Sequence, residues 1–401
     1  MRLSAAEESR IHAVLDDLSI ELPSWGFADT GTRFGKYLQP AAAIDLNDKL
    51  ADAGQVHRLT GCCPQVAIHV LWDLADGMEP SDMVRLAGQH GVRIGSINPN
   101  LFQDQVYKYG SLCHPEPGVR ERALKHCVES IELGQAVGSR VVTLWMADGT
   151  NYPGQDNMRA RKRRLQEGLQ ELHRHLSPEQ IFLLEYKPFE PAFYQTDIAD
   201  WGMSLSLARA MGDQARVLVD TGHHYQAQNI EQIVAWLLDE GMLGGFHFND
   251  RRYADDDLTL GAIDPYQVFR IFFEILSFAH DTGASPAIEY MVDQSHNLKP
   301  KVEAMLQTVM TAQELAAKAA LVNFDELARL QAAQDLVGCE RLLKTAFFSD
   351  VTGVINAWRT ERGLAPDPIS AHRESGYTEA AEHDRSQRRK ELGVTTGGGY
   401  A

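Results

Sequence analysis

Eight short apolar runs recur along the chain, and each is followed by a segment in which apolar residues repeat with helical spacing. The runs are almost continuously apolar, which is typical of parallel strands that are covered on both faces. Eight strands alternating with helices over about 270 residues favour a closed (β/α)8 barrel, the TIM-barrel fold of the α/β class, over an open doubly wound sheet. The runs occupy residues 22–28, 65–72, 92–100, 140–147, 181–188, 215–224, 243–250 and 285–293.

The segments between the runs contain helix start and stop signals. Apolar residues within 124–131 form one helical stripe, and Gly138 stands where a left-handed residue would end that helix. Asp264 followed by Pro265 predicts the N-cap and first residue of a later helix. No glycine-rich GxGxxG turn follows the first run, so a dinucleotide-binding fold gains no support.

The pattern divides the chain into four parts. Residues 1–20 predict a polar amphipathic helix that lacks the apolar core of a signal peptide, and residues 21–300 hold the barrel. Residues 301–380 predict a C-terminal helical extension, whose apolar stripes must pack on the barrel or on another subunit, so we expect it to serve oligomerisation. Residues 381–401 are polar and end in a glycine-rich stretch, so we expect a flexible tail.

Net charge and cysteine spacing argue against a nucleic-acid partner, a disulfide framework and a thiolate zinc site. The net charge of −17 would repel nucleic-acid phosphates. Five cysteines without CxxC spacing argue against a disulfide framework and against a thiolate zinc site. No apolar run approaches the roughly 18 residues of a membrane span. We therefore expect a cytoplasmic protein with neither a nucleic-acid nor a membrane partner.

Polar side chains gather where the fifth to eighth apolar runs end, which in a barrel is the active-site face. This mixture of oxygen and nitrogen ligands suits Mn²⁺, Mg²⁺ or Co²⁺ better than a closed structural zinc site. Six or seven ligands favour two metal ions over one. The cluster comprises Glu185, Lys187, Asp220, His223, His224, His247, Asn249, Asp250, Asp255, Asp256, Asp257, Glu289, Asp293 and His296.

Each of these residues has an ordinary explanation when it is taken alone. An aspartate at the end of a strand usually caps a helix, and a histidine such as His247 is more often a hydrogen-bonded core residue. The run 255–257 could be a solvated loop, and Lys187 a surface side chain. The metal hypothesis depends on their occurring together at four successive strand ends.

Aromatic residues lie near the ends of the first four runs. Sugar C–H faces stack on aromatic rings, while sugar hydroxyls bind neighbouring polar groups. An aromatic wall beside the polar cluster therefore favours a sugar site, although a tryptophan at a strand end is often only core. The residues are Trp25, Phe34, His69, Trp72, Phe102 and Trp145.

Several motifs together resemble the bacterial L-rhamnose isomerases, and in particular the branch that also interconverts D-allose and D-psicose. The resemblance runs in order from about residue 20 to about residue 375. The motifs that carry it are PSWGFADTGTRF (23–34), IHVLWD (68–73), QVYKYGSL (105–112), DGTNYPGQ (148–155), EYKPFEPAFY (185–194), DTGHH (220–224), GGFHFND with its trailing YADDDL (244–258) and DQSHN (293–297).

This resemblance implies an aldose–ketose isomerase that works as a homotetramer with two divalent ions per chain, Mn²⁺ first, with Co²⁺, Mg²⁺ or Zn²⁺ as alternatives. It implies a structural metal bound by Glu185, Asp220, His247 and Asp293, and a catalytic metal bound by His223, Asp255, Asp257 and the bridging Glu185. The implied catalytic residues are Glu185, Lys187 and Asp257. The implied substrate contacts are His69, Trp72, Trp145, Lys187 and Asp293, together with Phe34, which reaches into a neighbouring subunit's site.

Two chemical routes and three rival functions stay open. The hydrogen could pass directly between the two carbons, with Lys187 neutralising charge. Alternatively a base, either Glu185 or a metal-bound hydroxide held by Asp257, could form an enediol. The nearest rival is a ketose 3-epimerase with one metal. The others are a barrel metallo-phosphodiesterase or endonuclease, which usually carries a basic groove, and a non-catalytic sugar-binding protein.

Overall fold

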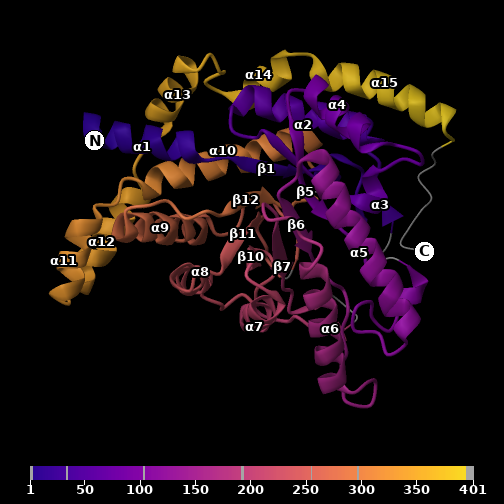
Figure 1. The fold of residues 1–401 in the computed structure, drawn as a ribbon. Helices are drawn as coiled ribbons and strands as arrows, with labels where there is room; N and C mark the ends of the chain where they lie inside the picture. The colour runs from indigo at the N-terminus through magenta and orange to yellow at the C-terminus, as the bar shows by residue number, and fades with distance from the viewer. Residues whose placement is uncertain are drawn as a thin grey trace.

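A closed barrel of eight parallel strands forms the centre of the computed structural model (Figure 1). The structure describes residues 3–32, 35–102, 104–190, 194–253, 255–295 and 298–393. The predicted (β/α)8 fold is confirmed, with one strand at each of the eight apolar runs; seven strands lie inside their runs, and β1 begins two residues before its run. The strands, in the order in which they pair around the barrel, are β1 (Ile20–Pro23), β4 (Gln65–His69), β5 (Arg93–Asn98), β6 (Val141–Leu144), β7 (Ile181–Glu185), β10 (Ala215–Asp220), β11 (Leu243–Phe248) and β12 (Glu289–Val292).

Eight helices surround the barrel, and their ends follow the local signals. Gly138 closes α5 in the left-handed region with φ 77°, a conformation that costs glycine little. The Asp264 side chain accepts a hydrogen bond from the Gln267 amide at the start of α9, as the Asp-Pro pair predicted. The helices are α2 (Leu46–Thr60), α4 (Pro80–Gln89), α5 (Pro117–Val137), α6 (Met158–His173), α7 (Trp201–Met211), α8 (Ile230–Asp239), α9 (Pro265–Thr282) and α10 (Lys301–Ala319).

The first two predicted strands run past the residues at which the observed strands end. The chain leaves β1 as a 3-10 turn, η1 (Ser24–Phe27), and leaves β4 as the short helix α3 (Val70–Asp73). Both turns hold tryptophans that line the barrel mouth, so apolar composition alone extended the strands too far. Two hairpins were not predicted, namely β2 (Gly31–Thr32) with β3 (Gly35–Lys36), and β8 (Phe189–Glu190) with β9 (Tyr194–Gln195).

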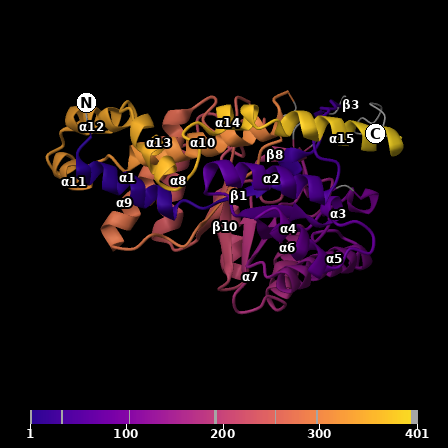
Figure 2. The same cartoon turned by 90° about the horizontal axis from the view of Figure 1, so that it is seen from above.

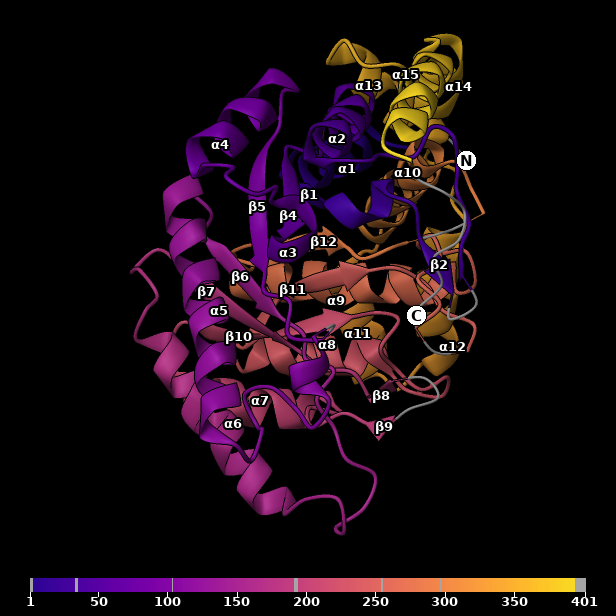
Figure 3. The same ribbon diagram turned by 90° about the vertical axis from the view of Figure 1, so that its right-hand side faces the viewer.

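The predicted domain boundary at residue 300 falls directly before helix α10, which begins at Lys301. Helix α10 follows the last strand and packs against α9 and α2, so it is the eighth helix of the barrel. Further helices lie outside this ring. Figures 2 and 3 show α13 and α14 beside the N-terminal helices, and Figures 1 and 2 show α11 and α12 at one end of the molecule. They are α1 (Ala5–Asp17), α11 (Phe324–Ala332), α12 (Leu336–Phe347), α13 (Thr352–Glu361) and α14 (Pro368–Glu374).

Residues 381–391, the first part of the expected tail, are helical in the structure. Helix α15 (Tyr377–Glu391) continues through them and packs on α2, because Arg385 donates two hydrogen bonds of 2.9 Å to the buried carboxylate of Asp52. The polar composition of this segment did not predict the contact, because the side chains that it buries are charged and form ion pairs. Residues 394–401 lie outside the described part of the chain. Within that part, none of the helices is both long enough and apolar enough to span a bilayer.

Candidate active site

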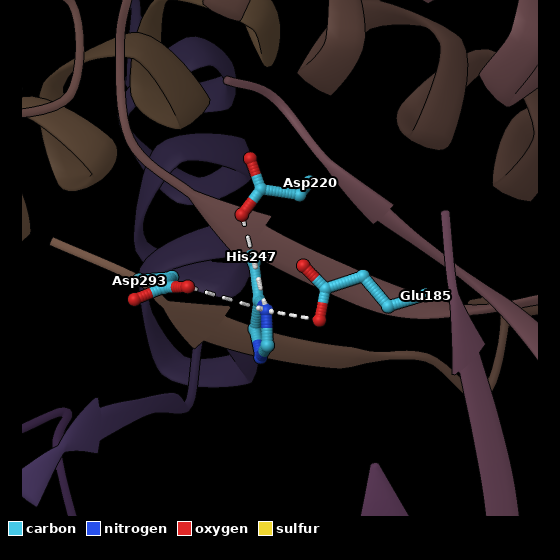
Figure 4. A group of neighbouring side chains, drawn as sticks. All are labelled: Glu185, Asp220, His247 and Asp293. Carbon is cyan, nitrogen blue, oxygen red and sulfur yellow. Dashed lines mark ion pairs between the residues drawn. The ribbon is translucent and has the colours of Figure 1, made fainter. Parts of the chain in front are cut away.

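Four of the predicted ligands meet where β7, β10, β11 and β12 end. Glu185, Asp220, His247 and Asp293 each offer one ligand atom, and these atoms all lie within 4.8 Å of one another. Figure 4 shows the His247 ring among the three carboxylates. Its Nδ1 atom lies 3.3 Å from Glu185 Oε2 and 3.9 Å from an oxygen of Asp220 and of Asp293.

The electrostatics of this cluster fit a divalent cation. Among the described residues, neither ring nitrogen of the buried His247 has a hydrogen-bond partner. Burial, with Glu185 and Asp293 nearby, raises the pKa of Asp220 to about 7, because three carboxylates cannot all stay charged in so small a volume. Burial opposes a charge on His247, but Glu185, Asp293 and Asp220 together outweigh it and raise the pKa of the ring to about 9. A bound cation would satisfy the ring and the carboxylates together.

Neighbouring donors hold the carboxylates of this cluster in place. Asn249 Nδ2 donates to Asp220 Oδ1 over 3.0 Å, and the Gly222 amide donates to the same oxygen over 2.6 Å. Trp25 Nε1 donates to Asp293 Oδ1 over 2.7 Å. Hydrogen bonds of this kind fix the direction in which ligand oxygens point.

The other three predicted ligands lie beside the first four. His223 Nδ1 lies 3.0 Å from the Tyr186 carbonyl, and its Nε2 lies 2.9 Å from Asp255 Oδ1. Asp255 Oδ2 also accepts from Lys187 Nζ over 2.5 Å, whereas Asp257 Oδ2 accepts from Ser295 Oγ over 2.7 Å. The structure therefore brings His223 and Asp255 into contact and turns Asp257 towards Ser295.

Backbone strain is concentrated in the loop that holds the two aspartates. Asp255 and Asp257 have φ values of 51° and 48°, in the left-handed region that non-glycine residues seldom occupy. Burial, followed by the charges of Asp255 and Asp293, raises the pKa of Asp257 well above its usual range. Strain and crowded charge in the same loop are typical of functional sites.

An arc of rings completes the mouth on the side of β1, β4, β5 and β6. Ring centroids are separated by 4.7 Å between Trp25 and His69, 4.2 Å between His69 and Trp72, and 5.6 Å between Trp72 and Phe102. Phe102 then lies 4.9 Å from Trp145, whose ring has the Lys187 ammonium 4.8 Å from its centroid. We call these five rings the aromatic arc. Phe34 lies outside the described residues.

Two polar atoms of the aromatic arc are buried without a partner. Trp145 Nε1 and His69 Nδ1 make no hydrogen bond to any described residue. Burial lowers the pKa of His69 to about 3, so its ring is neutral near neutral pH. A neutral ring can donate or accept one hydrogen bond at the free nitrogen, which matches a sugar hydroxyl. Unpaired buried polar atoms are costly, so a ligand that satisfies both would gain free energy of binding.

Some supporting residues gave no signal in the sequence. Asp73 binds Lys49 and Ser24 at the base of the aromatic arc, and these contacts join segments far apart in the chain. The buried guanidinium of Arg251 donates to the carbonyls of Thr221 and His224, on both sides of His223. Only the fold brings these groups together, so residue spacing could not predict them.

Comparison with known proteins identifies the family. The model of the xylose isomerase-like TIM barrel family matches residues 67–276. A protein of Mesorhizobium japonicum described as "Probable sugar isomerase" is 36% identical over 374 residues, which cover 92% of this chain and 86% of that protein. A second protein of that description, from Rhizobium meliloti, is 37% identical over 89% of this chain and 84% of its own length. The chain belongs to the xylose isomerase-like TIM barrel family.

Solved structures share the barrel at much lower identity. The structure of an L-ribulose 3-epimerase superposes with a TM-score of 0.53 and 14% sequence identity, covering 80% of this chain and 98% of the epimerase. At that identity the likeness defines the common fold. The chemistry must be argued from the side chains at the mouth.

Proposed function

We propose that this protein is a divalent-metal-dependent aldose–ketose isomerase, with L-rhamnose and related sugars such as D-allose as substrates. One observation carries the proposal: the four-residue cluster around His247 lies beside an aromatic arc with two buried polar atoms that have no hydrogen-bond partner among the described residues. The two relatives described as probable sugar isomerases support the same reaction class. The rhamnose assignment rests on the motifs shared with L-rhamnose isomerases.

The chain's own residues have distinct roles in this proposal. Glu185, Asp220, His247 and Asp293 would hold one ion, and His223, Asp255 and Asp257, with Glu185 shared, would hold a second. Mn²⁺ is the first choice, with Co²⁺, Mg²⁺ or Zn²⁺ as alternatives. Bound ions supply Lewis acidity that polarises a carbonyl and lowers the pKa of a neighbouring hydroxyl.

Substrate binding is assigned to the aromatic arc and to three residues outside it, Lys187, Asp293 and Phe34. Trp72 and Trp145 would stack on the apolar faces of the sugar, and His69 Nδ1 would hydrogen-bond a hydroxyl. Lys187, buried beside Trp145 and ion-paired to Asp255, would place a positive charge next to the reacting oxygens. Asp293 would contact the substrate as well as the ion, and Phe34 would do so from a neighbouring subunit.

The test is metal-dependent turnover. Protein stripped with EDTA is assayed for ketose formation from L-rhamnose and D-allose, with and without Mn²⁺. We expect Mn²⁺ to restore turnover to the wild type and not to His247→Asn. His280→Asn serves as the matched control, because His280 lies on α9 with its ring 42% exposed. No turnover of any aldose, combined with 3-epimerisation of free ketoses, would overturn the isomerase in favour of the epimerase.

We also propose a homotetramer in the cytoplasm. Helix α12 and the residue that follows it expose Leu336, Val337 and Phe348, each at least three-quarters exposed in the single chain. Exposed apolar groups of this size favour a subunit interface. Light scattering after size exclusion checks the assembly, and a monomeric mass at micromolar concentration would contradict it.

A further inference from the structure

A single buried carboxylate supports one half of the aromatic arc. Asp73 ends helix α3, and its side chain has no exposed surface. Its Oδ2 accepts from Ser24 Oγ over 2.6 Å and from the His69 backbone amide over 2.8 Å. Its Oδ1 accepts from the ammonium of Lys49 in α2, a side chain that is 6% exposed. Three segments that are distant in sequence therefore meet at one carboxylate.

Each of the mouth segments held by Asp73 carries a ring of the aromatic arc. Ser24 precedes Trp25 in η1, and Asp73 itself follows Trp72 in α3. His69 lies between these two rings, at 4.7 Å from Trp25 and 4.2 Å from Trp72. The hydrogen bonds to Asp73 hold backbone and side-chain atoms next to the rings, and none of them reaches into the mouth. Asp73 therefore acts on a sugar through the rings, and saturating Mn²⁺ in the test offsets any weaker hold of Trp25 on Asp293.

We propose that Asp73 is a positioning residue that sets the spacing of Trp25, His69 and Trp72, and thereby determines which sugars the site accepts. The inference rests on the proposed isomerase function and deepens it. In the proposed reaction, the metal ligands and Lys187 act on the reacting carbons of the sugar. None of these residues contacts Asp73. A displaced arc should therefore weaken sugar binding more than it slows the chemical step.

The physical reason is the cost of leaving this carboxylate incompletely paired. It is a buried charge with a charged partner and two further donors, so loss of its charge leaves the Lys49 ammonium unpaired. An asparagine at the same position has one acceptor oxygen, and its amide group would face either Lys49 or the donors Ser24 and His69. Either orientation breaks at least one contact and releases η1 or the end of β4.

The experiment compares Asp73→Asn with Asp52→Asn at saturating Mn²⁺. Asp52 is a matched control because it is also a buried carboxylate with three hydrogen bonds, but they come from Arg385 and Tyr377, outside the mouth. For Asp73→Asn we expect KM for L-rhamnose to rise about tenfold while kcat stays within about threefold. We also expect the ratio of kcat/KM between L-rhamnose and D-allose to change by at least about threefold. Asp52→Asn should leave both quantities at wild-type values.

A milder variant protects the test against failure to fold. Ser24→Ala removes one donor and keeps the ion pair, so KM should rise in the same direction by about two- to threefold. Unchanged KM and unchanged sugar preference in both Asp73→Asn and Ser24→Ala would overturn the positioning role while wild-type turnover upholds the isomerase. An equal fall in kcat and kcat/KM on both sugars would also overturn it. Wild-type protein that turns over no aldose would instead overturn the proposed function, and this inference with it.

Discussion

The indole nitrogen of Trp25 donates a 2.7 Å hydrogen bond to Asp293 Oδ1, which joins the first strand's turn to the residue that follows the last strand. The ring of the same tryptophan contacts the His69 ring edge to face, with the centroids 4.7 Å apart. One side chain therefore links the aromatic arc to the metal-ligand cluster.

Replacing this tryptophan should weaken metal binding. Trp25→Phe keeps most of the ring and loses the donor, which frees Asp293 to rotate. Loss of such an outer hydrogen bond typically costs about 10- to 100-fold in metal affinity. Calorimetric titration of EDTA-treated protein with Mn²⁺ measures the change. Trp236→Phe is the control, because Trp236 is 56% exposed on α8, and wild-type affinity in Trp25→Phe would contradict the linkage.

Asp257→Asn should separate the two proposed ions. Asparagine is nearly isosteric and tolerates the left-handed backbone at this position, so the loop is retained while a charged ligand is lost. We expect the Mn²⁺ stoichiometry to fall from two to one per chain and turnover to fall by about 100-fold or more. Asp256→Asn, in the same loop but bonded to the Arg252 and Tyr253 amides, should behave as wild type. Two ions in Asp257→Asn would contradict the ligand assignment.

A buried acid inside the barrel should make stability depend on pH. Glu21 is enclosed and accepts two hydrogen bonds from Ser96, and burial raises its pKa from 4.5 to about 7. Between these values the folded protein binds the proton more tightly than the unfolded chain, so the free energy of unfolding falls as pH rises through this window. The penalty is complete above about pH 7. The Glu21 carboxyl fits only because residue 95 is glycine, since a Cβ on Gly95 would lie 1.8 Å from Glu21 Oε2.

Glu21→Gln tests this dependence because it keeps the shape and removes the charge. In EDTA-treated protein at pH 8 the variant should be more stable than wild type by about 1–3 kcal/mol, with little difference at pH 4.5. Urea unfolding at the two pH values measures the change. The exposed Glu167→Gln should show no such pH dependence. A variant that loses stability equally at both pH values would show that the charge is not what matters.

Solvent isotope incorporation should distinguish the two routes for hydrogen transfer. Glu185 is a poor base here because its pKa is low. Burial raises this pKa, but His247 and His223 outweigh burial and lower it; their Nδ1 atoms lie 3.3 Å and 3.1 Å, respectively, from the Glu185 oxygens. We therefore expect direct transfer between the carbons, so that rhamnulose formed in D₂O carries no deuterium at C1. Deuterium at C1 would establish the enediol route, with Asp257 as the next carboxylate to test.

The strands could be predicted because burial on both faces forces nearly continuous apolar runs. The four residues Glu185, Asp220, His247 and Asp293 could be placed together for a related reason, since parallel strand ends meet at one mouth. The exact strand ends could not be predicted, because Trp25 and Trp72 are as apolar as strand residues yet belong to turns. Helix α15 was missed because its buried side chains are arginines, and the contacts of Asp73 because they depend on three-dimensional proximity alone.

The docking of α15 has a consequence for the order of events during synthesis. Arg385, which neutralises the buried Asp52, is 333 residues further along the chain, so α2 leaves the ribosome long before its partner exists. Until α15 emerges, Asp52 in α2 lacks the positive charge that it is paired with in the folded protein. This step of folding therefore waits for the synthesis of α15, and a nascent chain stopped before residue 385 should remain a substrate for chaperones.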